Sequence, residues 1–173
     1  MIIPGGKKTI QPSNNNYIAT SSTGTYASYK KPTAVDGAII LANGAKNKNG
    51  KWMIKPTTGE YTTYFGGRRG HWAVDIADVN KPLINAAADG TVLKSQCGWN
   101  GGYGCVVVLD HDDGFQTLYA HLSELNVAVG DSVQQGSKLG IMGNTGRVYG
   151  KTGIHLHFEV IDNGIKKNPL AYY

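Results

Sequence analysis

The sequence is poor in phenylalanine and cysteine, and it lacks the patterns that mark helical or repeat proteins. Its 173 residues include only three phenylalanines and two cysteines, and no segment keeps a helical apolar period for more than two turns. No internal repeat of solenoid length is present. The N-terminus has neither a long apolar run nor the basic start and hydrophobic core of a signal peptide. We therefore expect either a piece of a longer exported protein or export by a signal outside this chain.

The two cysteines, Cys97 and Cys105, bracket a glycine-rich loop. Two strands leaving such a loop would bring the thiols together, and a disulfide there contributes about 2–3 kcal/mol of stability on chain-entropy grounds. A disulfide implies an oxidising, extracytoplasmic location. Two free thiols are the alternative, and the C-x7-C spacing does not match the usual zinc-ligand spacing.

Residues that favour turns and short strands are abundant: the chain has 24 glycines and 10 tyrosines. From residue 51 onward, short strand-like segments alternate with Gly, Asp and Asn turns, which predicts an all-β protein with an antiparallel sheet and little helix. Residues 1–50 are rich in Ser, Thr and Asn, and we interpret them as a linker with a short packed strand near 35–41. The predicted domain covers 51–173.

The charge is mildly basic: 17 Lys and Arg stand against 12 Asp and Glu, for a net charge of +5. The basic residues are scattered and no nucleic-acid motif accompanies them, so we expect no nucleic-acid partner. A positive charge favours association with a polyanion such as an anionic cell wall. We also expect no membrane insertion and a monomer.

Two histidines stand two residues apart in Gly153–Val160, Gly-Ile-His-Leu-His-Phe-Glu-Val. The alternation predicts a strand in which His155 and His157 share one face, while Leu156 and Phe158 point to the core. Neutral imidazole is the commonest side-chain metal ligand and also carries protons near neutral pH. A pair of hydrogen-bonded structural histidines is the alternative for this motif taken alone.

Another segment supplies a histidine and a carboxylate. In an extended chain residues four apart share a face, so His71 and Asp75 converge. One histidine of the H-x-H strand would make three protein ligands, the number typical of a catalytic zinc site with a position open for water. The strand pattern does not decide whether His155 or His157 completes the set.

Two further histidines differ in context. His121 follows a β-branched and aromatic run, and a strand-end position suits a catalytic residue. His111 lies among aspartates before a glycine, and we interpret it as a solvated hairpin turn. No H-E-x-x-H helix is present, so a glutamate base of that kind is not indicated.

The motifs H-x3-D, Y-A-H-L, G-N-T-G and H-L-H-F-E occur in this order. Together they resemble the lysostaphin/LytM-type zinc endopeptidases that hydrolyse cell-wall peptidoglycan, over roughly residues 51–173. The resemblance implies a mostly antiparallel sheet lining a narrow groove, with zinc on the groove floor. Residues 129–140 resemble a small hairpin that this family shares with biotinyl and lipoyl carrier domains. Residues 2–6 resemble the end of a LysM carbohydrate-binding repeat.

By the same resemblance, His71, Asp75 and His157 correspond to the ligands of one zinc ion per chain. His121 and His155 correspond to the two catalytic histidines that do not bind metal. The substrate would be a peptide stem or cross-bridge of peptidoglycan, cleaved by metal-activated water. One histidine would accept the water proton while the other steadies the developing charge, and the sequence does not say which does which.

Each of three other residues has two alternative roles. Glu159 shares the face of the histidines, and either orients a ligand or is a plain surface residue. Tyr64 precedes the first zinc motif and is a possible oxyanion donor or groove-lining residue. Asn144 stands between glycines in G-N-T-G, as a possible groove residue or simply a turn former.

Two other function classes compete with the active enzyme. A catalytically inactive relative of the same fold would bind wall or activate an amidase, but such relatives typically lose ligand residues and this chain fills all five positions. A carrier domain needs a modifiable lysine on a tight turn, which the sequence does not show, and it would leave the histidines unexplained.

Overall fold

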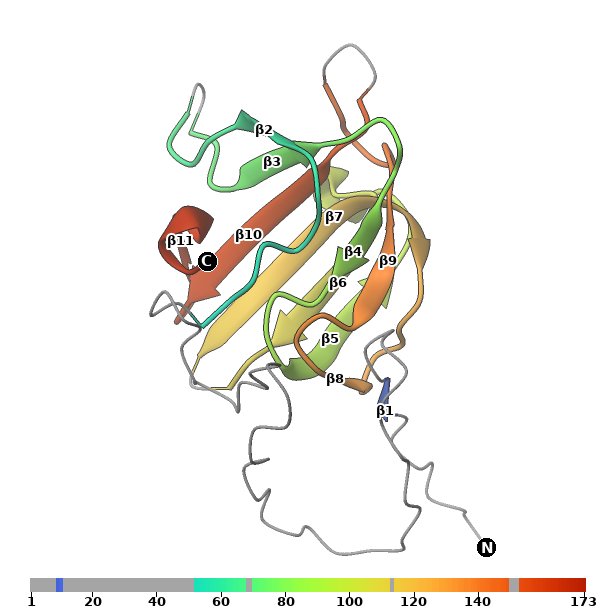
Figure 1. The fold of residues 1–173 in the computed structure, drawn as a ribbon, viewed down its shortest axis with the longest axis vertical. Coiled ribbons are helices and arrows are strands. Elements are labelled where there is room, and N and C mark those ends of the chain that lie inside the picture. The colour runs from blue at the N-terminus through green and yellow to red at the C-terminus, as the bar shows by residue number, and fades with distance from the viewer. Residues whose placement is uncertain (1–8, 11–51, 68–69, 113, 150–152) are drawn as a thin grey trace, which may run out of the picture.

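The computed structural model describes residues 9–10, 52–67, 70–112, 114–149 and 153–173. Within these ranges the chain is built from eleven strands and two single-turn 3-10 helices (Figure 1). The strands are β1 (Thr9–Ile10), β2 (Glu60–Thr63), β3 (Val74–Ala77), β4 (Leu83–Asn85), β5 (Gly90–Gln96), β6 (Cys105–Asp110), β7 (Phe115–Leu125), β8 (Ser132–Val133), β9 (Lys138–Met142), β10 (Leu156–Asp162) and β11 (Ile165–Lys167). The helices are η1 (Asn100–Gly102) and η2 (Pro169–Ala171).

The strands form one sheet in the order β1-β8-β5-β6-β7-β10-β3-β2, with β11 on β10 and with β9 joining β7 to β4. Every pairing among the described strands is antiparallel except that of β1 with β8. The predicted all-β, antiparallel fold with little helix is therefore confirmed. In the part of the chain that the structure describes, no helix is long and apolar enough to cross a bilayer.

Strand β10 positions the groove because it lies between β3 and β7. Its register sets His157 opposite Asp75 on one side and opposite Ala120, the neighbour of His121, on the other. Residues from three distant parts of the sequence thus meet on one row of the sheet. Directly opposed residues in an antiparallel pair have Cβ atoms only about 4.5–5.5 Å apart, which is close enough for their side chains to share a ligand.

The two faces of β10 have opposite characters, as the alternation predicted. Leu156 and Phe158 have no exposed surface and belong to the main core, where they meet Val74 and Ile76 of β3 and Tyr119 of β7. Since successive side chains of a strand point to opposite faces, the histidines between these core residues face the other way. Burial of the apolar face therefore fixes the direction of the histidine face.

Two local predictions differ from the structure. The segment resembling a carrier hairpin, residues 129–140, does turn, since Ser137 N–H donates to Gln134 O at 2.9 Å. Its strands do not pair with each other: β8 pairs with β1 and β5, and β9 pairs with β4 and β7. The segment therefore joins separate parts of the sheet instead of forming a closed hairpin.

The hairpin turn predicted at His111 is present, since Phe115 N–H donates to Asp112 O at 2.9 Å, but the prediction that this histidine is solvated is wrong. The Nδ1 atom of His111 lies 2.6 Å from Asp89 O, its Nε2 atom lies 2.6 Å from Thr117 Oγ1, and Trp52 packs edge-on against its ring. Burial lowers the pKa of His111. The aspartates around it suggested solvent, but β6 and β7 enclose the ring at the end of their shared ladder.

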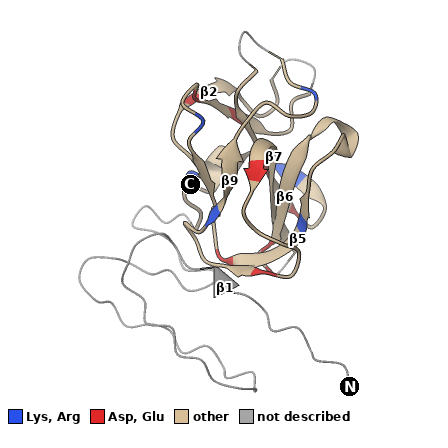
Figure 2. Cartoon of the chain, turned by 90° about the vertical axis from the view of Figure 1, so that its right-hand side faces the viewer, with Lys and Arg blue, Asp and Glu red and all other residues tan. Residues whose placement is uncertain are grey.

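The remaining predictions concern the N-terminal part of the chain. Of residues 1–50 the structure describes Thr9–Ile10, which pair with β8 as β1. The rest of the linker over residues 1–50, the packed strand near 35–41 and the LysM-like end at residues 2–6 lie outside the described residues. Lys and Arg of the described chain are spread over separate elements, in keeping with the scattered basic residues of the sequence (Figure 2).

Candidate metal centre and groove

A groove of about 1170 Å³ runs over the histidine face of the sheet. Small-molecule sites typically occupy about 300–1,000 Å³, so this groove is large enough for a segment of a polymer. Its lining includes all five residues assigned to metal and catalysis, together with Glu159: His71, Asp75, His121, His155, His157 and Glu159.

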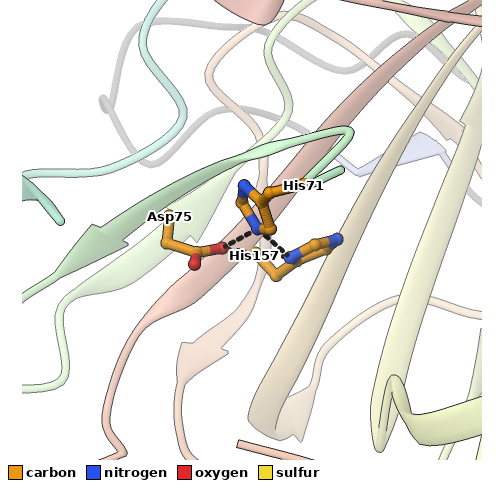
Figure 3. A group of neighbouring side chains, drawn as sticks. All are labelled: His71, Asp75 and His157. Carbon is orange, nitrogen blue, oxygen red and sulfur yellow. Dashed lines mark hydrogen bonds and ion pairs between the residues drawn. The ribbon is translucent and has the colours of Figure 1, made fainter. Parts of the chain in front are cut away.

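Three donor atoms converge on the groove floor (Figure 3). His71 Nε2 lies 3.1 Å from Asp75 Oδ1, His157 Nδ1 lies 3.0 Å from the same oxygen, and the two nitrogens are 3.3 Å apart. Bonds of about 2.0–2.1 Å to a tetrahedral zinc ion would separate its ligand atoms by about 3.3 Å. Two imidazole nitrogens and a carboxylate oxygen at this spacing fit a zinc ion with a fourth position left open.

The turn before β3 places His71. Gly70, at φ +69°, closes a tight turn in which its N–H donates to Gly67 O, and His71 then forms an isolated antiparallel bridge with Gly67. Glycine adopts a positive φ without the steric cost that a side chain imposes. His71 lies three residues before β3, and its side chain reaches the carboxylate of Asp75.

The other ring nitrogen of His157 faces Glu159. His157 Nε2 lies 3.0 Å from Glu159 Oε1, and the same oxygen accepts from Lys166 Nζ and from Tyr103 OH, each at 2.8 Å. Glu159 is 1 % exposed, so it is not the plain surface residue of the sequence-based alternative. Burial by itself would raise the pKa of Glu159, but the hydrogen bonds from His157, Lys166 and Tyr103 leave it lowered.

Because ionised Glu159 can only accept, Nε2 of His157 carries a proton, and Nδ1 is the ring atom that faces the donor cluster and could bind a metal ion. Burial also opposes the charge on Lys166, whose pKa is nevertheless raised by its contact with Glu159. The carboxylate is thus a fixed negative charge behind a ring that points its other nitrogen, Nδ1, at the donor cluster.

His121 and His155 stand beside the three-atom cluster with their ring centroids 4.8 Å apart. His121 Nδ1 lies 2.8 Å from Thr145 O and His155 Nδ1 lies 3.0 Å from Gly153 O. Carbonyl oxygens only accept, so both rings carry hydrogen on Nδ1 and keep Nε2 as a free acceptor. Both rings are poised to take up a proton at that atom.

Both rings are neutral at pH 7. Burial, reinforced by the neighbouring His155, lowers the pKa of His121 to about 4. Burial likewise lowers the pKa of His155, although the charge of Asp75 acts in the opposite direction. Since His155 Nε2 is 4.0 Å from Asp75 Oδ1, it reaches the edge of the donor cluster without belonging to its closest atoms.

His121 does not lie past the end of a strand, as predicted, but inside β7. The register between β6 and β7 shifts between the Cys105 and Val107 pairings, and His121 has φ +65° in this irregularity. Its N–H donates to Tyr103 O at 2.9 Å. Bulges turn a side chain away from the alternation of the strand and are common near active sites.

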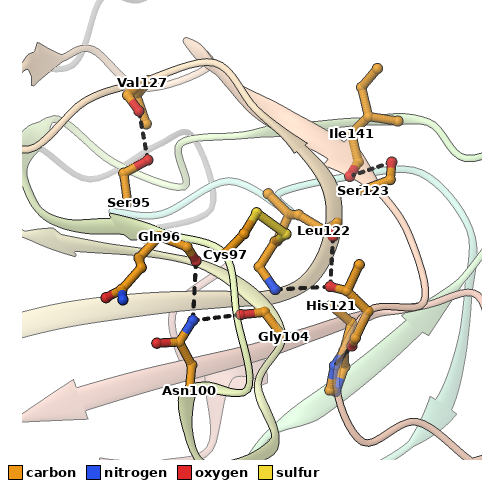
Figure 4. Close-up of a disulfide and its surroundings, with 12 residues drawn as sticks. Ser95, Gln96, Cys97, Asn100, Gly104, His121, Leu122, Ser123, Val127 and Ile141 are labelled. Carbon is orange, nitrogen blue, oxygen red and sulfur yellow. Dashed lines mark hydrogen bonds between the residues drawn. A yellow bond between two sulfur atoms is a disulfide. The ribbon is translucent and has the colours of Figure 1, made fainter.

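The predicted disulfide between Cys97 and Cys105 is formed, and it closes the loop that holds η1 (Figure 4). This loop packs on the G-N-T-G segment: Cys105 N–H donates to Thr145 Oγ1, and the Thr145 hydroxyl donates to Leu122 O. A Cβ added at Gly104 would lie 2.4 Å from Thr145 atoms, so only glycine permits this approach. The two loops form one wall beside His121.

The structure does not bring Tyr64 or Asn144 into the groove lining among its described residues. Tyr64 is 55 % exposed and its ring lies 6.0 Å from that of Tyr61. Asn144 is exposed, and its neighbour Thr145 provides the carbonyl that holds His121. The prediction of groove roles for Tyr64 and Asn144 is therefore not supported by their positions.

Sequence reasoning missed Tyr103, Thr145 and Lys166. Thr145 acts through its backbone carbonyl, which has no residue-specific signal. Tyr103 and Lys166 reach Glu159 from 56 residues before it and 7 residues after it. The sequence offered one hint of Tyr103 and Lys166, which is Glu159 on the histidine face. A carboxylate that is buried there requires hydrogen-bond donors around it.

Comparison with known families gives one clear match: a model of Peptidase family M23 matches residues 69–169. The DD-carboxypeptidase/endopeptidase Mpg of Neisseria meningitidis is 41 % identical over 101 residues, covering 58 % of this chain and 22 % of Mpg. The peptidoglycan DD-endopeptidase ShyC of Vibrio cholerae is 41 % identical over 118 residues, covering 67 % of this chain and 24 % of ShyC.

A relative of another kind is the murein hydrolase activator NlpD of Salmonella typhimurium. It is 30 % identical over 160 residues, covering 92 % of this chain and 40 % of NlpD. The chain therefore spans between about a fifth and two fifths of the length of these curated relatives.

Solved structures show the same fold. A putative peptidase M23 from Pseudomonas aeruginosa has a TM-score of 0.62 at 30 % identity, covering 76 % of this chain and 54 % of that one. A zinc-containing peptidase from Vibrio cholerae has a TM-score of 0.61 at 25 % identity, covering 74 % and 44 %. The antimicrobial peptidase lysostaphin from Staphylococcus simulans has a TM-score of 0.59 at 28 % identity, covering 66 % and 48 %.

Proposed function

This chain belongs to peptidase family M23, and we propose that it is a zinc-dependent endopeptidase that hydrolyses peptide bonds in bacterial peptidoglycan. The observation that carries the proposal is the convergence of His71 Nε2, Asp75 Oδ1 and His157 Nδ1 within 3.3 Å of one another. Two neutral histidines with free Nε2 atoms beside this cluster supply the proton chemistry that hydrolysis needs.

In this proposal His71, Asp75 and His157 hold one zinc ion. When bound, the ion would lower the pKa of water toward neutrality and polarise the scissile carbonyl. The protein's own residues hold the ion and position the groups around it. Asp75 supplies the negative charge of the ligand set. The register of β3 and β10 holds Asp75 opposite His157, and the turn before β3 brings His71 to them.

His121 and His155 provide the proton transfer and the charge stabilisation in this proposal. One ring accepts a proton at Nε2 from the attacking water and returns it to the leaving amine. The other ring can donate to the oxygen on which negative charge develops once its own Nε2 has taken up a proton. The backbone acceptors Thr145 O and Gly153 O keep both rings in the Nδ1–H tautomer, so the acceptor atom is ready before substrate arrives. The lowered pKa of each ring keeps it free to act as a base at neutral pH.

Glu159 orients His157 in this scheme. Its carboxylate fixes the ring tautomer, while Lys166 and Tyr103 fix the carboxylate in turn. Such outer partners of metal ligands typically change metal affinity about 10–100-fold when they are removed.

The alternative is an activator of another hydrolase without its own catalysis, as the similarity to NlpD suggests. Complete metal and catalytic positions favour the enzyme, since a domain that only binds or activates needs none of them. We further propose that residues 51–173 form the peptidase domain after a linker over residues 1–50, that the protein acts outside the cytoplasm as a monomer, and that its partner is the peptide of the wall.

The proposal is tested by measuring zinc content and the release of amino groups from purified peptidoglycan. We expect one zinc per wild-type chain with release of amines, loss of both in His157→Ala, and loss of release alone in His121→Ala. A zinc-loaded wild type that releases no amines but stimulates a wall amidase would establish the activator function instead.

A further inference from the structure

Arg147 is a groove cation without an acidic partner. Two basic residues of the described chain, Arg147 and Lys166, line the groove. Lys166 forms a 2.8 Å ion pair with Glu159. No carboxylate among the described residues forms an ion pair with Arg147, and its side chain is exposed. Within the described ranges, the groove therefore presents one uncompensated positive charge to whatever occupies it.

The guanidinium of Arg147 contacts Tyr149, which is itself 66 % exposed. Its Nε–H donates to Tyr149 OH at 2.6 Å, and its Cζ lies 5.6 Å from the centroid of the Tyr149 ring. Its backbone N–H donates to Gly102 O at 2.7 Å, which ties the residue to the disulfide-closed loop. Ordering a long side chain in advance removes part of the entropy cost of binding a ligand. With Nε already used, the two terminal nitrogens remain for an incoming group.

The two acidic residues that line the groove do not compete for this charge. Asp75 is surrounded by His71, His155 and His157, and Glu159 accepts from His157, Lys166 and Tyr103. Since the described residues offer no free carboxylate at this point, the anion that pairs with Arg147 would come from the ligand. The planar fork of a guanidinium matches a carboxylate through two parallel hydrogen bonds, and carboxylates are the anionic groups of a peptide.

We propose that Arg147, oriented by Tyr149, forms a subsite for a free carboxylate of the substrate peptide, so that the groove selects acidic over amidated wall peptides. The proposal rests on the peptidase function above and adds to it the charge of the substrate. Arg147 makes the contact, and Tyr149 is a positioning residue that fixes the plane of the guanidinium.

The experiment compares wall peptides that differ only in the replacement of one carboxylate by a carboxamide, with each carboxylate replaced in turn. For one position, we expect zinc-loaded wild type to cleave the acid with a kcat/KM about 10- to 100-fold above that of the amide, as for a charged hydrogen bond. Arg147→Gln should lose this preference by losing activity on the acid only. Tyr149→Phe should reduce the preference in part.

The matched control is Lys94→Gln, which removes a cation of β5 that does not line the groove, and it should keep the wild-type preference. Equal losses on acid and amide in Arg147→Gln, or no acid preference in wild type, would overturn the proposal. The same peptides are also titrated for Kd against His121→Ala and His121→Ala/Arg147→Gln. This readout tests the subsite without catalysis, so a protein that binds the acid selectively but cleaves nothing would refute the peptidase function alone.

Discussion

The histidines of the groove and the histidine at the end of the β6–β7 ladder are held in opposite ways. His111 has each ring nitrogen directed at its own partner, Asp89 O and Thr117 Oγ1, so neither nitrogen is available to a ligand. His71 and His157 instead direct nitrogens at the same carboxylate oxygen. Burial lowers the pKa of His111 as it does that of His121. A histidine of the metal centre is therefore distinguished from a structural histidine by a ring nitrogen that converges with other ligand atoms on one point. Burial and a lowered pKa do not make this distinction, since His111 shares them with the groove histidine His121.

The largest expected difference in kcat is between a variant of a groove histidine and a variant of the structural histidine His111. His155→Ala should reduce kcat by about 10²–10⁴-fold, the usual worth of a positioned acid or base, while zinc content stays at the wild-type level. His111→Gln should leave kcat per folded molecule unchanged, because its nitrogens face the protein. The measurement is amine release from peptidoglycan at matched zinc loading. Similar losses of kcat in the two variants would remove the distinction.

The wall that supports His121 provides the next contrast. Replacing Cys97 and Cys105 by serine should lower the free energy of unfolding by about 2–3 kcal/mol, because a loop with a sequence separation of 8 is no longer closed in the unfolded chain. Urea unfolding of the double variant against wild type measures this difference. Since Tyr103 O accepts from His121 N within this wall, kcat should fall as well, whereas hydrogen exchange at His111 should stay slow. Unchanged stability would contradict the expectation.

Glu159→Gln tests whether His157 depends on the carboxylate behind it. We expect zinc affinity to fall about 10–100-fold, as for other outer partners of metal ligands. Competition with a chelator measures the affinity. The matched control is Glu124→Gln, an exposed glutamate of β7, which should bind zinc like wild type. An unaltered affinity in Glu159→Gln would show that the ring is held by β10 alone.

The smallest expected effect concerns the stability of the scaffold at acid pH. Burial lowers the pKa of His111 below 6.5, so the unfolded chain takes up a proton at a higher pH than the folded chain does. Stability from neutral His111 is therefore complete above about 6.5 and decreases as the pH falls toward the folded pKa. The difference in unfolding free energy between wild type and His111→Gln, measured from pH 8 to 5, should shrink on acidification. A constant difference would refute this.

The alternation of β10 was readable from sequence because the two-residue period of a strand is fixed by backbone geometry. It separated His155 and His157 from Leu156 and Phe158, as the structure has them. The pairing of His157 with Asp75 was not readable locally, because register depends on which distant strand lies alongside. The family resemblance supplied it, and the assigned roles stay predictions.

The differences between prediction and structure arise from contacts that a local pattern does not record. Asn144 was chosen for its side chain, whereas Thr145 acts through a carbonyl, and every residue has one. His121 was placed after a strand because the local pattern does not reveal a bulge inside β7. His111 was assigned to solvent from its acidic neighbours, although Thr117 on the facing strand encloses it. Side-chain patterns record which residues face the core, but not which carbonyls or strands meet them.

At position 121 stability and activity favour different residues, because His121 has a left-handed backbone conformation. A residue with a side chain held at φ +65° costs of order 1–3 kcal/mol, which glycine avoids. In a library of all residues at position 121, a screen for folding alone should enrich glycine and asparagine over histidine, while a screen on peptidoglycan should return histidine. The chain thus keeps a less stable residue there because of what its ring does.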